Sequence, residues 1–274
     1  MPLPDRSADT VPGGAVVSDR GLVHQRNEDA GAVAPGIAVV CDGVSMSPDP
    51  DDASRAAVDA VLQVLTGPAE HGTGPAGRAG TPAGPVARAP GGPADGAGGP
   101  EERLAAAARA AAAAVAALGD PGHAPACTLV AATLDAGVLR VVGIGDSRAY
   151  WVPDDGPAEL VTEDDSWAAG AIRAGEDPDR AWADARAHTL TSWLGADAQV
   201  PTEVRTVRLD RSGLVVLCSD GLWNYLLDPA EFGAAVRAAY AGDLLETADS
   251  LVALALDRGG RDNITVALLR HEAA

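Results

Sequence analysis

The sequence predicts a layered α/β sandwich, because its strands come in bunches and its helices come in pairs. A parallel doubly wound sheet would instead require strands and helices to alternate one by one. Hydrophobic residues make up 47% of the chain, which is ample for a core, although aromatic residues contribute only 3%. The 274 residues, apart from one segment of biased composition, therefore indicate a single large domain over residues 15–270.

The N-terminal part is expected to contain strands. Residues 1–14 include Pro and Gly and are predicted to be a flexible start. Ala15–Val17 follows as a short strand, and the Pro35-Gly36 turn joins two more, Ala30–Ala34 and Ile37–Cys41. The run Ile37–Cys41 is apolar without alternation, which is typical of a strand buried on both faces.

Two helices are expected next, joined by a long connector. Asp51 or Asp52 is predicted to cap a helix that runs to about Leu65. Its inner face is expected to carry Ala53, Ala56, Ala57, Ala60, Val61 and Val64. The second helix, Glu101–Leu118, has acidic residues in its first turn and ends at Gly119.

The connector between these helices has an unusual composition. Of the 34 residues from 67 to 100, 18 are Gly or Pro. Such a segment buries too little apolar surface to fold, so we predict a disordered insertion at about 67–100. Its length should matter little to the fold, since the cost of closing a loop grows slowly with loop length.

The C-terminal part returns to a β pattern from Cys127 onward. Three of its runs, Thr128–Leu134, Val138–Ile144 and Ala149–Val152, resemble a meander. Further strands are expected at Glu159–Thr162, Glu203–Leu209, Leu214–Cys218 and Asn263–Leu269. Helices are expected within residues 163–195 and over Pro229–Tyr240 and Asp243–Arg258.

Charge and composition exclude several classes of protein. With 39 acidic residues, 20 arginines and no lysine, the formal net charge is −19, which argues against a nucleic-acid partner and against an anionic membrane surface. No apolar run has the length of a signal peptide or of a membrane span, so we expect a cytoplasmic protein. The three cysteines, Cys41, Cys127 and Cys218, show no paired spacing and are expected to be buried, reduced thiols.

Carboxylates follow several of the apolar strands. Asp42-Gly43 ends one run, Asp146 another and Asp220-Gly221 a third, while Asp262 precedes the last strand. A single Asp-Gly after a strand is most often only a turn. Four carboxylates at the ends of buried strands are different, because they would converge, repel one another and resist burial.

Divalent cations would relieve this repulsion. Oxygen ligands suit Mg²⁺ or Mn²⁺, and the lack of clustered Cys and His argues against zinc. Gly43 has no Cβ, so a backbone carbonyl could approach the ion. Two such ions bridged by a carboxylate, with a water of lowered pKa between them, perform in-line attack on phosphoryl groups.

The ordered motifs resemble the metal-dependent protein phosphatases, the type 2C Ser/Thr phosphatase family, in a bacterial single-domain form. The resemblance covers nearly the whole chain outside 67–100. The residues that carry it are Ser18–Asp29, Val40–Val44, Cys127-Thr128, Gly143–Tyr150, Val161–Ser166, Leu217–Leu222 and Gly260–Val266. Single motifs such as Asn-Glu-Asp are weak, but their order along the chain is specific.

The resemblance implies a four-layer α-β-β-α sandwich with two central, mainly antiparallel sheets and a metal site at the sheet ends. It implies two Mn²⁺ or Mg²⁺ ions, with a third in bacterial members. Asp42 would bridge two ions, the Gly43 carbonyl would bind one, and Asp220 and Asp262 would complete the direct ligands. The remaining implied roles belong to Glu28 and Asp29, which would hold metal-bound water, to Asp146 at the third metal, and to Asn263 beside the last ligand.

The implied reaction is hydrolysis of phosphoserine or phosphothreonine esters by direct attack of a hydroxide that bridges the two metals. The implied substrates are phosphoproteins, those of Ser/Thr kinases, in bacterial signal transduction, and the protein is expected to be a monomer. No covalent phosphoenzyme is expected, because the chain has neither a Cys-x5-Arg loop nor a P-loop.

Two departures from the family pattern leave alternatives open. His24 stands where the family commonly has a phosphate-binding arginine, so it either contacts the phosphate or packs, and Arg20 or Arg26 could substitute. Val44 replaces a histidine common in eukaryotic members, so a metal-bound water would protonate the leaving group. Two other functions therefore remain open: a weak or inactive phosphoprotein-binding regulator, and a phosphatase of anti-anti-sigma-type phosphoproteins.

Overall fold

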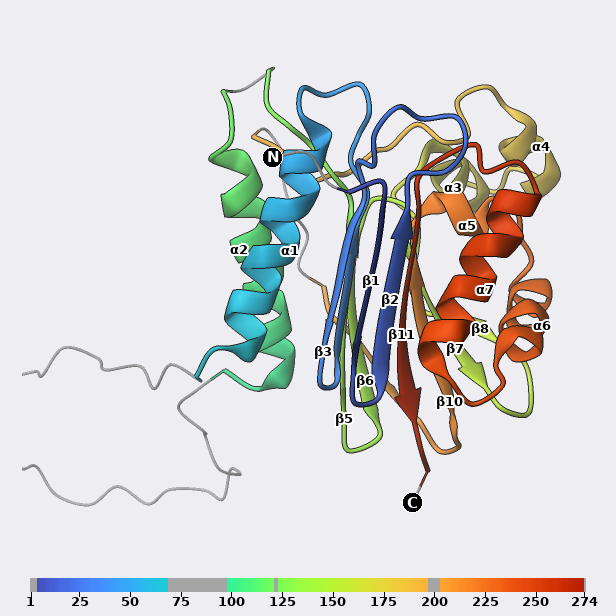
Figure 1. Ribbon diagram of the computed structural model, residues 1–274. Coiled ribbons are helices and arrows are strands. Elements are labelled where there is room, and N and C mark those ends of the chain that lie inside the picture. Colours follow the sequence, from blue (N-terminus) through green and yellow to red (C-terminus); the bar gives the residue numbers. More distant parts are fainter. Residues whose placement is uncertain (1–3, 69–97, 121–122, 197–202, 274) are drawn as a thin grey trace, which may run out of the picture.

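Two β-sheets are stacked face to face and covered on both outer sides by helices (Figure 1). The structure, a computed structural model, describes residues 4–68, 98–120, 123–196 and 203–273. The strands are β1 Arg6–Val11, β2 Gly14–Asp19, β3 Ala30–Ala34, β4 Ile37–Cys41, β5 Leu129–Asp135, β6 Val138–Ile144, β7 Arg148–Pro153, β8 Glu159–Leu160, β9 Arg205–Arg208, β10 Gly213–Cys218 and β11 Ile264–His271. The helices are α1 Pro50–Thr66, α2 Pro100–Ala116, α3 Trp167–Arg173, α4 Pro178–Ala183, α5 Asp220–Trp223, α6 Pro229–Ala239 and α7 Leu244–Asp257.

Every strand pairing in the two sheets is antiparallel. One sheet has the order β1-β2-β11-β10-β7-β8, and the other has the order β3-β4-β5-β6-β9. Helices α1 and α2 pack on the second sheet, whereas α6 and α7 pack on the first. The predicted four-layer α-β-β-α sandwich is therefore confirmed.

Three apolar layers hold the sandwich together. Between the sheets, Val40, Val130, Trp151 and Leu217 belong to one buried cluster. A second cluster joins α1 and α2 to their sheet through small residues such as Ala57 and Ala108, and the third joins α6 and α7 to theirs. Alternate residues of a strand point to opposite faces, so strands covered on both sides are apolar throughout, as β4 and β10 are.

The two helices beside the Gly/Pro-rich connector are held to each other directly. The Arg103 guanidinium of α2 donates to the carbonyl oxygens of Val64, Leu65 and Gly67, at 3.1, 3.0 and 2.5 Å. Val64 and Leu65 belong to the last turn of α1 and Gly67 directly follows it, so no further helical N–H is available to these carbonyls. Arg103 therefore caps α1 from the neighbouring helix. The expected insertion at 67–100 lies mostly outside the described residues.

The N-terminus differs from the expected flexible start over residues 1–14. β1 pairs with β2 from Arg6↔Asp19 to Val11↔Gly14. The Pro12-Gly13 pair that suggested fraying is a hairpin turn, in which Gly13 adopts a φ of 77°. Nearly every residue of β1 is exposed, so the strand carries no apolar pattern that a sequence could reveal.

Three further expectations are corrected. The predicted meander is divided between the sheets, because β5 and β6 pair in one sheet whereas β7 pairs with β10 in the other. The N-cap of α1 is Asp49, with a left-handed backbone and no side-chain cap, so neither Asp51 nor Asp52 caps it. The inner face of α1 was predicted in most positions, since Ala53, Ala57 and Val61 are buried and Ala60 and Val64 are partly buried against the same cluster. Ser54, Val58 and Leu65 are also buried, although the sequence did not single them out.

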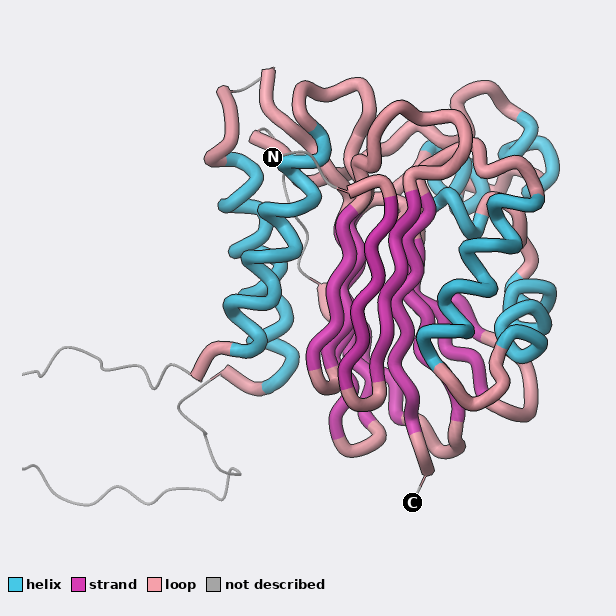
Figure 2. Tube along the Cα trace, viewed as in Figure 1, coloured by secondary structure: helices cyan, strands magenta, loops and turns pink. Residues whose placement is uncertain are grey.

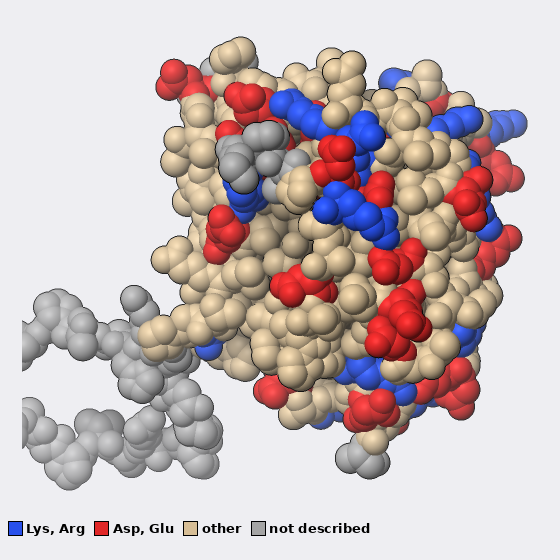
Figure 3. All heavy atoms as spheres, viewed as in Figure 1, with Lys and Arg blue, Asp and Glu red and all other residues tan. Residues whose placement is uncertain are grey.

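Loops gather at one end of the two sheets, where β2, β4, β6 and β10 end (Figure 2). This end holds the chain segments that carry the acidic motifs. Acidic and basic side chains are interspersed on the face of the molecule in Figure 3.

Candidate metal centre

Five aspartates gather at the loop end of the sandwich. Asp42 follows β4, Asp146 lies between β6 and β7, and Asp220 opens α5 directly after β10, while Asp29 precedes β3 and Asp262 precedes β11. Strand ends from both sheets therefore supply the acidic groups, as the sequence pattern predicts. Asp29 and Asp146 are buried, whereas Asp262 leaves 44% of its side chain exposed.

The carboxylates act on one another electrostatically. Burial raises the pKa of Asp42 well above its usual range, and the charges of Asp29, Asp220, Asp146 and Asp262 raise it further. The pKa of Asp220 is raised in the same way, by burial and then by Asp146, Asp262 and Asp29. Burial is also the main reason that the pKa of Asp29 rises to about 6 and that of Asp146 to about 7. Concentrated negative charge of this kind favours divalent cations.

Asp42 is held by backbone and side-chain contacts to Thr128. The Asp42 N–H donates to Thr128 Oγ1 at 3.0 Å, and the Thr128 N–H donates to the Asp42 carbonyl at 2.7 Å. Thr128 Oγ1 also lies 2.7 Å from Ser147 Oγ, in the segment that carries Asp146. Thr128 therefore links two of the acidic segments, a role that the sequence did not reveal beyond the Cys127-Thr128 motif.

One carboxylate oxygen of Asp29 accepts a hydrogen bond, whereas the other has no hydrogen-bond partner among the described residues. Ser219 Oγ donates to Asp29 Oδ2 at 2.7 Å, which joins the start of β3 to the end of β10. Among the described residues, Asp29 Oδ1 is buried and has no hydrogen-bond partner. A buried carboxylate oxygen without a donor is costly, and a bound cation would satisfy it. The donor set of this site therefore fits a hard divalent metal.

Asn263 connects the loop of residues 20–28 to the last strand. Its Oδ1 accepts from the Glu28 N–H at 2.7 Å, and its Nδ2 donates to the carbonyls of Arg20 and Arg26 at 2.7 and 3.1 Å. The sequence predicted that Asn263 steadies the last ligand. In the structure its side chain holds the loop that carries Glu28 and Asp29, and its backbone N–H donates to Asp262 Oδ1 at 2.8 Å.

Two glycines permit close approaches beside the acidic residues. A Cβ at Gly43 would lie 2.7 Å from the Glu28 carbonyl oxygen and 2.8 Å from Pro50 Cβ. A Cβ at Gly221 would lie 1.9 Å from the carbonyl oxygen of Asn263. Both Asp-Gly pairs are therefore required by packing, in addition to any role of the Gly43 carbonyl.

A buried ion pair between Arg148 and Asp164 supports Asp146 through Trp223. Arg148 and Asp164 are almost fully buried and paired, with Arg148 Nη2 2.7 Å from Asp164 Oδ2. The Arg148 guanidinium stacks 3.6 Å over the Trp223 ring, and Trp223 Nε1 donates to the Asp146 carbonyl at 2.9 Å. From the sequence, Arg148 was only one member of the Gly143–Tyr150 motif and had no predicted role. A lone arginine in an apolar strand nevertheless indicates a buried acidic partner.

The side chains of His24 and Glu28 both contact other side chains of the protein. His24 Nε2 lies 3.2 Å from Asp262 Oδ1, so the residue at the expected phosphate position contacts a predicted metal ligand. Glu28 accepts from Arg26 Nε at 2.8 Å and from Ser45 Oγ at 2.5 Å.

The ligand assignments stay predictions. Within the described ranges, no three Asp, Glu, His or Cys side chains are arranged as a ready-made metal site. This applies to the direct ligands and also to the water-mediated and third-metal roles. The residues concerned are Asp42, Gly43, Asp220, Asp262, Glu28, Asp29 and Asp146.

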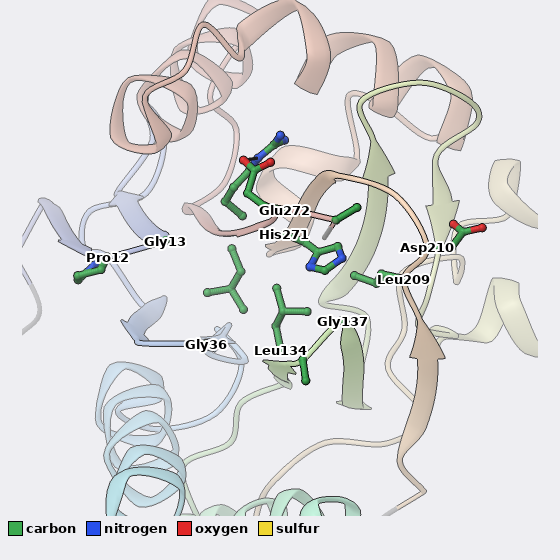
Figure 4. Close-up of a pocket in the computed structure, with 13 residues that line it drawn as sticks. Pro12, Gly13, Gly36, Leu134, Gly137, Leu209, Asp210, His271 and Glu272 are labelled. Carbon is green, nitrogen blue, oxygen red and sulfur yellow. Dashed lines mark hydrogen bonds and ion pairs between the residues drawn. The ribbon is translucent and has the colours of Figure 1, made fainter.

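A cavity of about 710 Å³ lies at the other end of the sandwich, among the hairpin turns at Gly13, Gly36 and Gly137 (Figure 4). Leu134, Leu209 and His271 line it, and Arg270 at its edge is already paired with Asp154 and Glu272. None of the predicted site residues is among those that line this cavity.

Comparison with known proteins decides the family. The sequence profile described as Protein phosphatase 2C matches residues 22–249. The chain belongs to this family. The resemblance seen in the motifs is therefore confirmed.

Curated relatives include bacterial Ser/Thr phosphatases. The serine/threonine phosphatase Stp of Listeria innocua is 34% identical over 145 residues, 53% of this chain and 56% of the relative. The serine/threonine protein phosphatase PstP of Mycobacterium tuberculosis is 30% identical over 257 residues, 92% of this chain and 43% of the relative. The chain thus spans about half the length of the curated relatives it matches.

Solved structures show the same fold. The structure of M. tuberculosis PstP is 26% identical, with a TM-score of 0.72, over 94% of this chain and 98% of that one. A structure of the PstP catalytic domain in complex with two manganese ions is also 26% identical, with a TM-score of 0.71, over 94% and 96% of the two chains. The match extends over both sheets and their helices.

Two of the sequence expectations concern features outside the site. The three cysteines are free and buried, as predicted. No helix in the described part of the chain combines the length and the apolar character that a membrane span needs.

Proposed function

We propose that this chain is a metal-dependent protein Ser/Thr phosphatase that hydrolyses phosphoserine and phosphothreonine esters. The observation that carries the proposal is the convergence of Asp29, Asp42, Asp146, Asp220 and Asp262 at one end of a protein phosphatase 2C fold. The raised pKa values of Asp29, Asp42, Asp146 and Asp220 mean that these four groups are stable as carboxylates only beside positive charge.

The proposed cofactors are two Mn²⁺ or Mg²⁺ ions, with Asp146 and Asp220 holding a third. The binding of two manganese ions by the PstP catalytic domain supports this proposal. Such ions, when bound, neutralise phosphate charge and activate water for attack on phosphorus. Asp42, the Gly43 carbonyl, Asp220 and Asp262 are the proposed direct ligands, with Glu28 and Asp29 in water-mediated roles.

The protein's own residues keep this site in shape. Asn224 Nδ2 donates to Asp220 Oδ2 at 3.1 Å, and Ser219 holds Asp29, so both carboxylates have fixed orientations. His24 can orient Asp262 through its 3.2 Å contact and remains the proposed substrate contact at that position. Arg26 is paired with Glu28 and Asp51, so it is not free to replace the missing arginine.

Direct hydrolysis is favoured over a cysteinyl-phosphate route. The cysteines are buried, and burial raises the pKa of the Cys41 thiol well above its usual range. A thiol that stays protonated and is closed off from solvent is a poor nucleophile. The proposed nucleophile is therefore water.

Exposed apolar residues beside the site support a protein substrate. Leu22 and Val23 are 66% and 65% exposed, and Met46 is 99% exposed. They lie in the loops that lead to His24 and from Asp42, at the same end of the sheets as the aspartates. Such residues are suited to contact a polypeptide around the phosphorylated side chain. We propose phosphoproteins made by Ser/Thr kinases as substrates, in cytoplasmic bacterial signalling, and a monomeric enzyme.

The test is phosphate release from a phosphothreonine peptide with Mn²⁺, with Mg²⁺ and with excess chelator. Metal-dependent release that the chelator abolishes is expected. No release from folded protein with either metal would contradict the proposal. It would favour a phosphoprotein-binding regulator, with His24 as the residue that changed the function.

A further inference from the structure

A second cavity, of about 310 Å³, opens directly beside the predicted metal centre. It lies between α4, α5 and the segment that leads to β11. Its lining, here called the Arg261 pocket, consists of Trp182, His188, Gly221, Asn224, Tyr225, Leu227, Arg261 and Asp262. Asp262 is itself a proposed metal ligand, and Asn224 binds another, Asp220. The pocket and the metal centre therefore share an edge.

The aromatic wall of the Arg261 pocket is held firmly. The Trp182 ring lies 5.7 Å from His188 and 5.9 Å from Trp223, measured between centroids. The buried Arg148 guanidinium stacks on Trp223 and lies 5.7 Å from the Trp182 ring. A wall braced by a buried ion pair gives a preformed surface, which lowers the entropic cost of binding.

Arg261 brings an exposed positive charge to this pocket. Its backbone N–H donates to Tyr225 Oη at 3.1 Å, which fixes the chain at this point. Its guanidinium has no acidic partner within 4.0 Å among the described residues, in contrast to Arg20 and Arg26. The charge of Arg261 is thus available to a ligand. In a chain of net charge −19, such a local cation is needed if an anionic group is to bind.

We propose that the Arg261 pocket binds an anionic side chain of the substrate, close in sequence to the phosphorylated residue. The inference rests on the proposed phosphatase function and adds a sequence preference to it. The shared edge at Asp262 positions a neighbouring side chain at Arg261 while the phosphoryl group occupies the metal centre. The guanidinium would pair with a carboxylate or with a second phosphate, and the aromatic wall would pack on the aliphatic part of that side chain.

The test compares phosphothreonine peptides that differ in one residue. Aspartate, phosphoserine or alanine is placed in turn at each position within three residues of the phosphothreonine. For the wild-type protein with Mn²⁺, kcat/KM for the acidic peptide at the preferred position should exceed that for the alanine peptide by about fivefold, the size expected of an exposed ion pair. The preference should weaken in high salt. Comparing the aspartate and phosphoserine peptides shows which anion the pocket prefers.

The variants assign this preference to one residue. Arg261→Gln should bring the acidic-to-alanine ratio close to one, and Arg261→Lys should restore part of it. Arg211→Gln is the matched control, because Arg211 is an exposed arginine near Asp155 and Asp210, outside the Arg261 pocket. A ratio that is near one in the wild type, or unchanged in Arg261→Gln, would overturn the inference.

A binding assay separates this inference from the proposed function. Non-hydrolysable phosphonate versions of the same peptides are titrated against wild type and Arg261→Gln by fluorescence anisotropy. An affinity preference for the acidic peptide that Arg261→Gln abolishes supports the pocket even if no peptide is hydrolysed, in which case only the proposed catalysis fails. Equal affinities for the acidic and alanine peptides would overturn the pocket whether or not turnover is seen.

Discussion

The carboxylate of Asp42 lies among four others. Its substitution should therefore affect both the binding of metal and the repulsion within the cluster. Asp42→Asn should lower kcat by roughly a thousandfold or more, because a proposed bridging ligand is lost. In chelator, however, the variant should melt at a higher temperature than the wild type, since one repelling buried charge is removed. Phosphate release and thermal melting with and without Mn²⁺ measure both effects.

The control for this variant is Asp59→Asn, an exposed position on α1. It should change neither turnover nor the response of the melting temperature to Mn²⁺. If Asp42→Asn retained near-normal activity with an unchanged circular dichroism spectrum, Asp42 would not be a metal ligand.

Thr128 gives a second prediction at the scale of one residue. Thr128→Val keeps the shape of the side chain but removes the oxygen that accepts from the Asp42 N–H and contacts Ser147. The loss should cost about 1–3 kcal/mol of unfolding free energy and weaken the apparent affinity for Mn²⁺. Thr128→Ser retains the oxygen and serves as the comparison in denaturant titrations. Equal Mn²⁺ affinity of the two variants would mean that this contact does not position Asp42.

The positions of the acidic residues were predictable from the sequence, but their contacts were not. Asp42 directly follows an uninterrupted apolar run and Asp220 follows another after Ser219, so both had to lie at sheet ends. The pairing of Ser219 with Asp29 joins residues 190 positions apart, and no local pattern encodes it. The contact between His24 and Asp262 is also long-range. For this reason the sequence could not decide whether His24 contacts the phosphate or packs inside the protein.

At the scale of elements, the Arg148–Asp164 pair joins β7 to the loop before α3 and, through Trp223, to α5. Arg148→Met should destabilise the protein by about 3–5 kcal/mol, because Asp164 would remain buried without a partner. The double variant Arg148→Met with Asp164→Leu should recover much of this loss. Urea denaturation of the single and double variants measures the recovery.

An exposed arginine on an aromatic ring provides the matched control. Arg186 stacks 4.1 Å over Trp167 and pairs with Asp184 at the surface, so Arg186→Met should be far less destabilising than Arg148→Met. If Arg148→Met were no more destabilising than Arg186→Met, the buried pair would not support the elements around Asp146.

The sequence predicted most elements but not how they are shared between the sheets. Apolar runs identified the buried strands, whereas exposed β1 and the single-turn α5 lack such a pattern. β7 was misplaced because strand periodicity tells which residues are buried and not which strand is the partner. The crossing from one sheet to the other takes place at Gly145, whose φ of 93° is rarely adopted by other residues.

For the whole molecule, the raised pKa values predict how stability depends on pH when metal is absent. The folded-state pKa values of Asp29, about 6, and Asp146, about 7, exceed the unfolded value near 4. The folded protein therefore holds protons that the unfolded chain releases, and stability falls as pH rises from about 4 to about 7. In chelator the melting temperature should drop by about 5 °C or more between pH 5.5 and pH 7.5.

Saturating Mn²⁺ should reverse this trend. Cations bind the deprotonated carboxylates, so metal binding strengthens and the melting temperature rises as pH increases over the same interval. Calorimetry at a series of pH values, with and without Mn²⁺, measures the two slopes. Identical slopes would show that the aspartate cluster does not bind the metal.

The Arg103 cap on α1 makes the protein a candidate for fragment complementation. A cut within residues 69–97 would separate β1–β4 and α1 from everything that follows, yet β4 pairs with β5 and β2 pairs with β11 across the cut. Asp29 and Asp42 would lie on one fragment, and Asp146, Asp220 and Asp262 on the other. Neither half would hold a complete acidic cluster, so phosphatase activity would report directly on their reassembly.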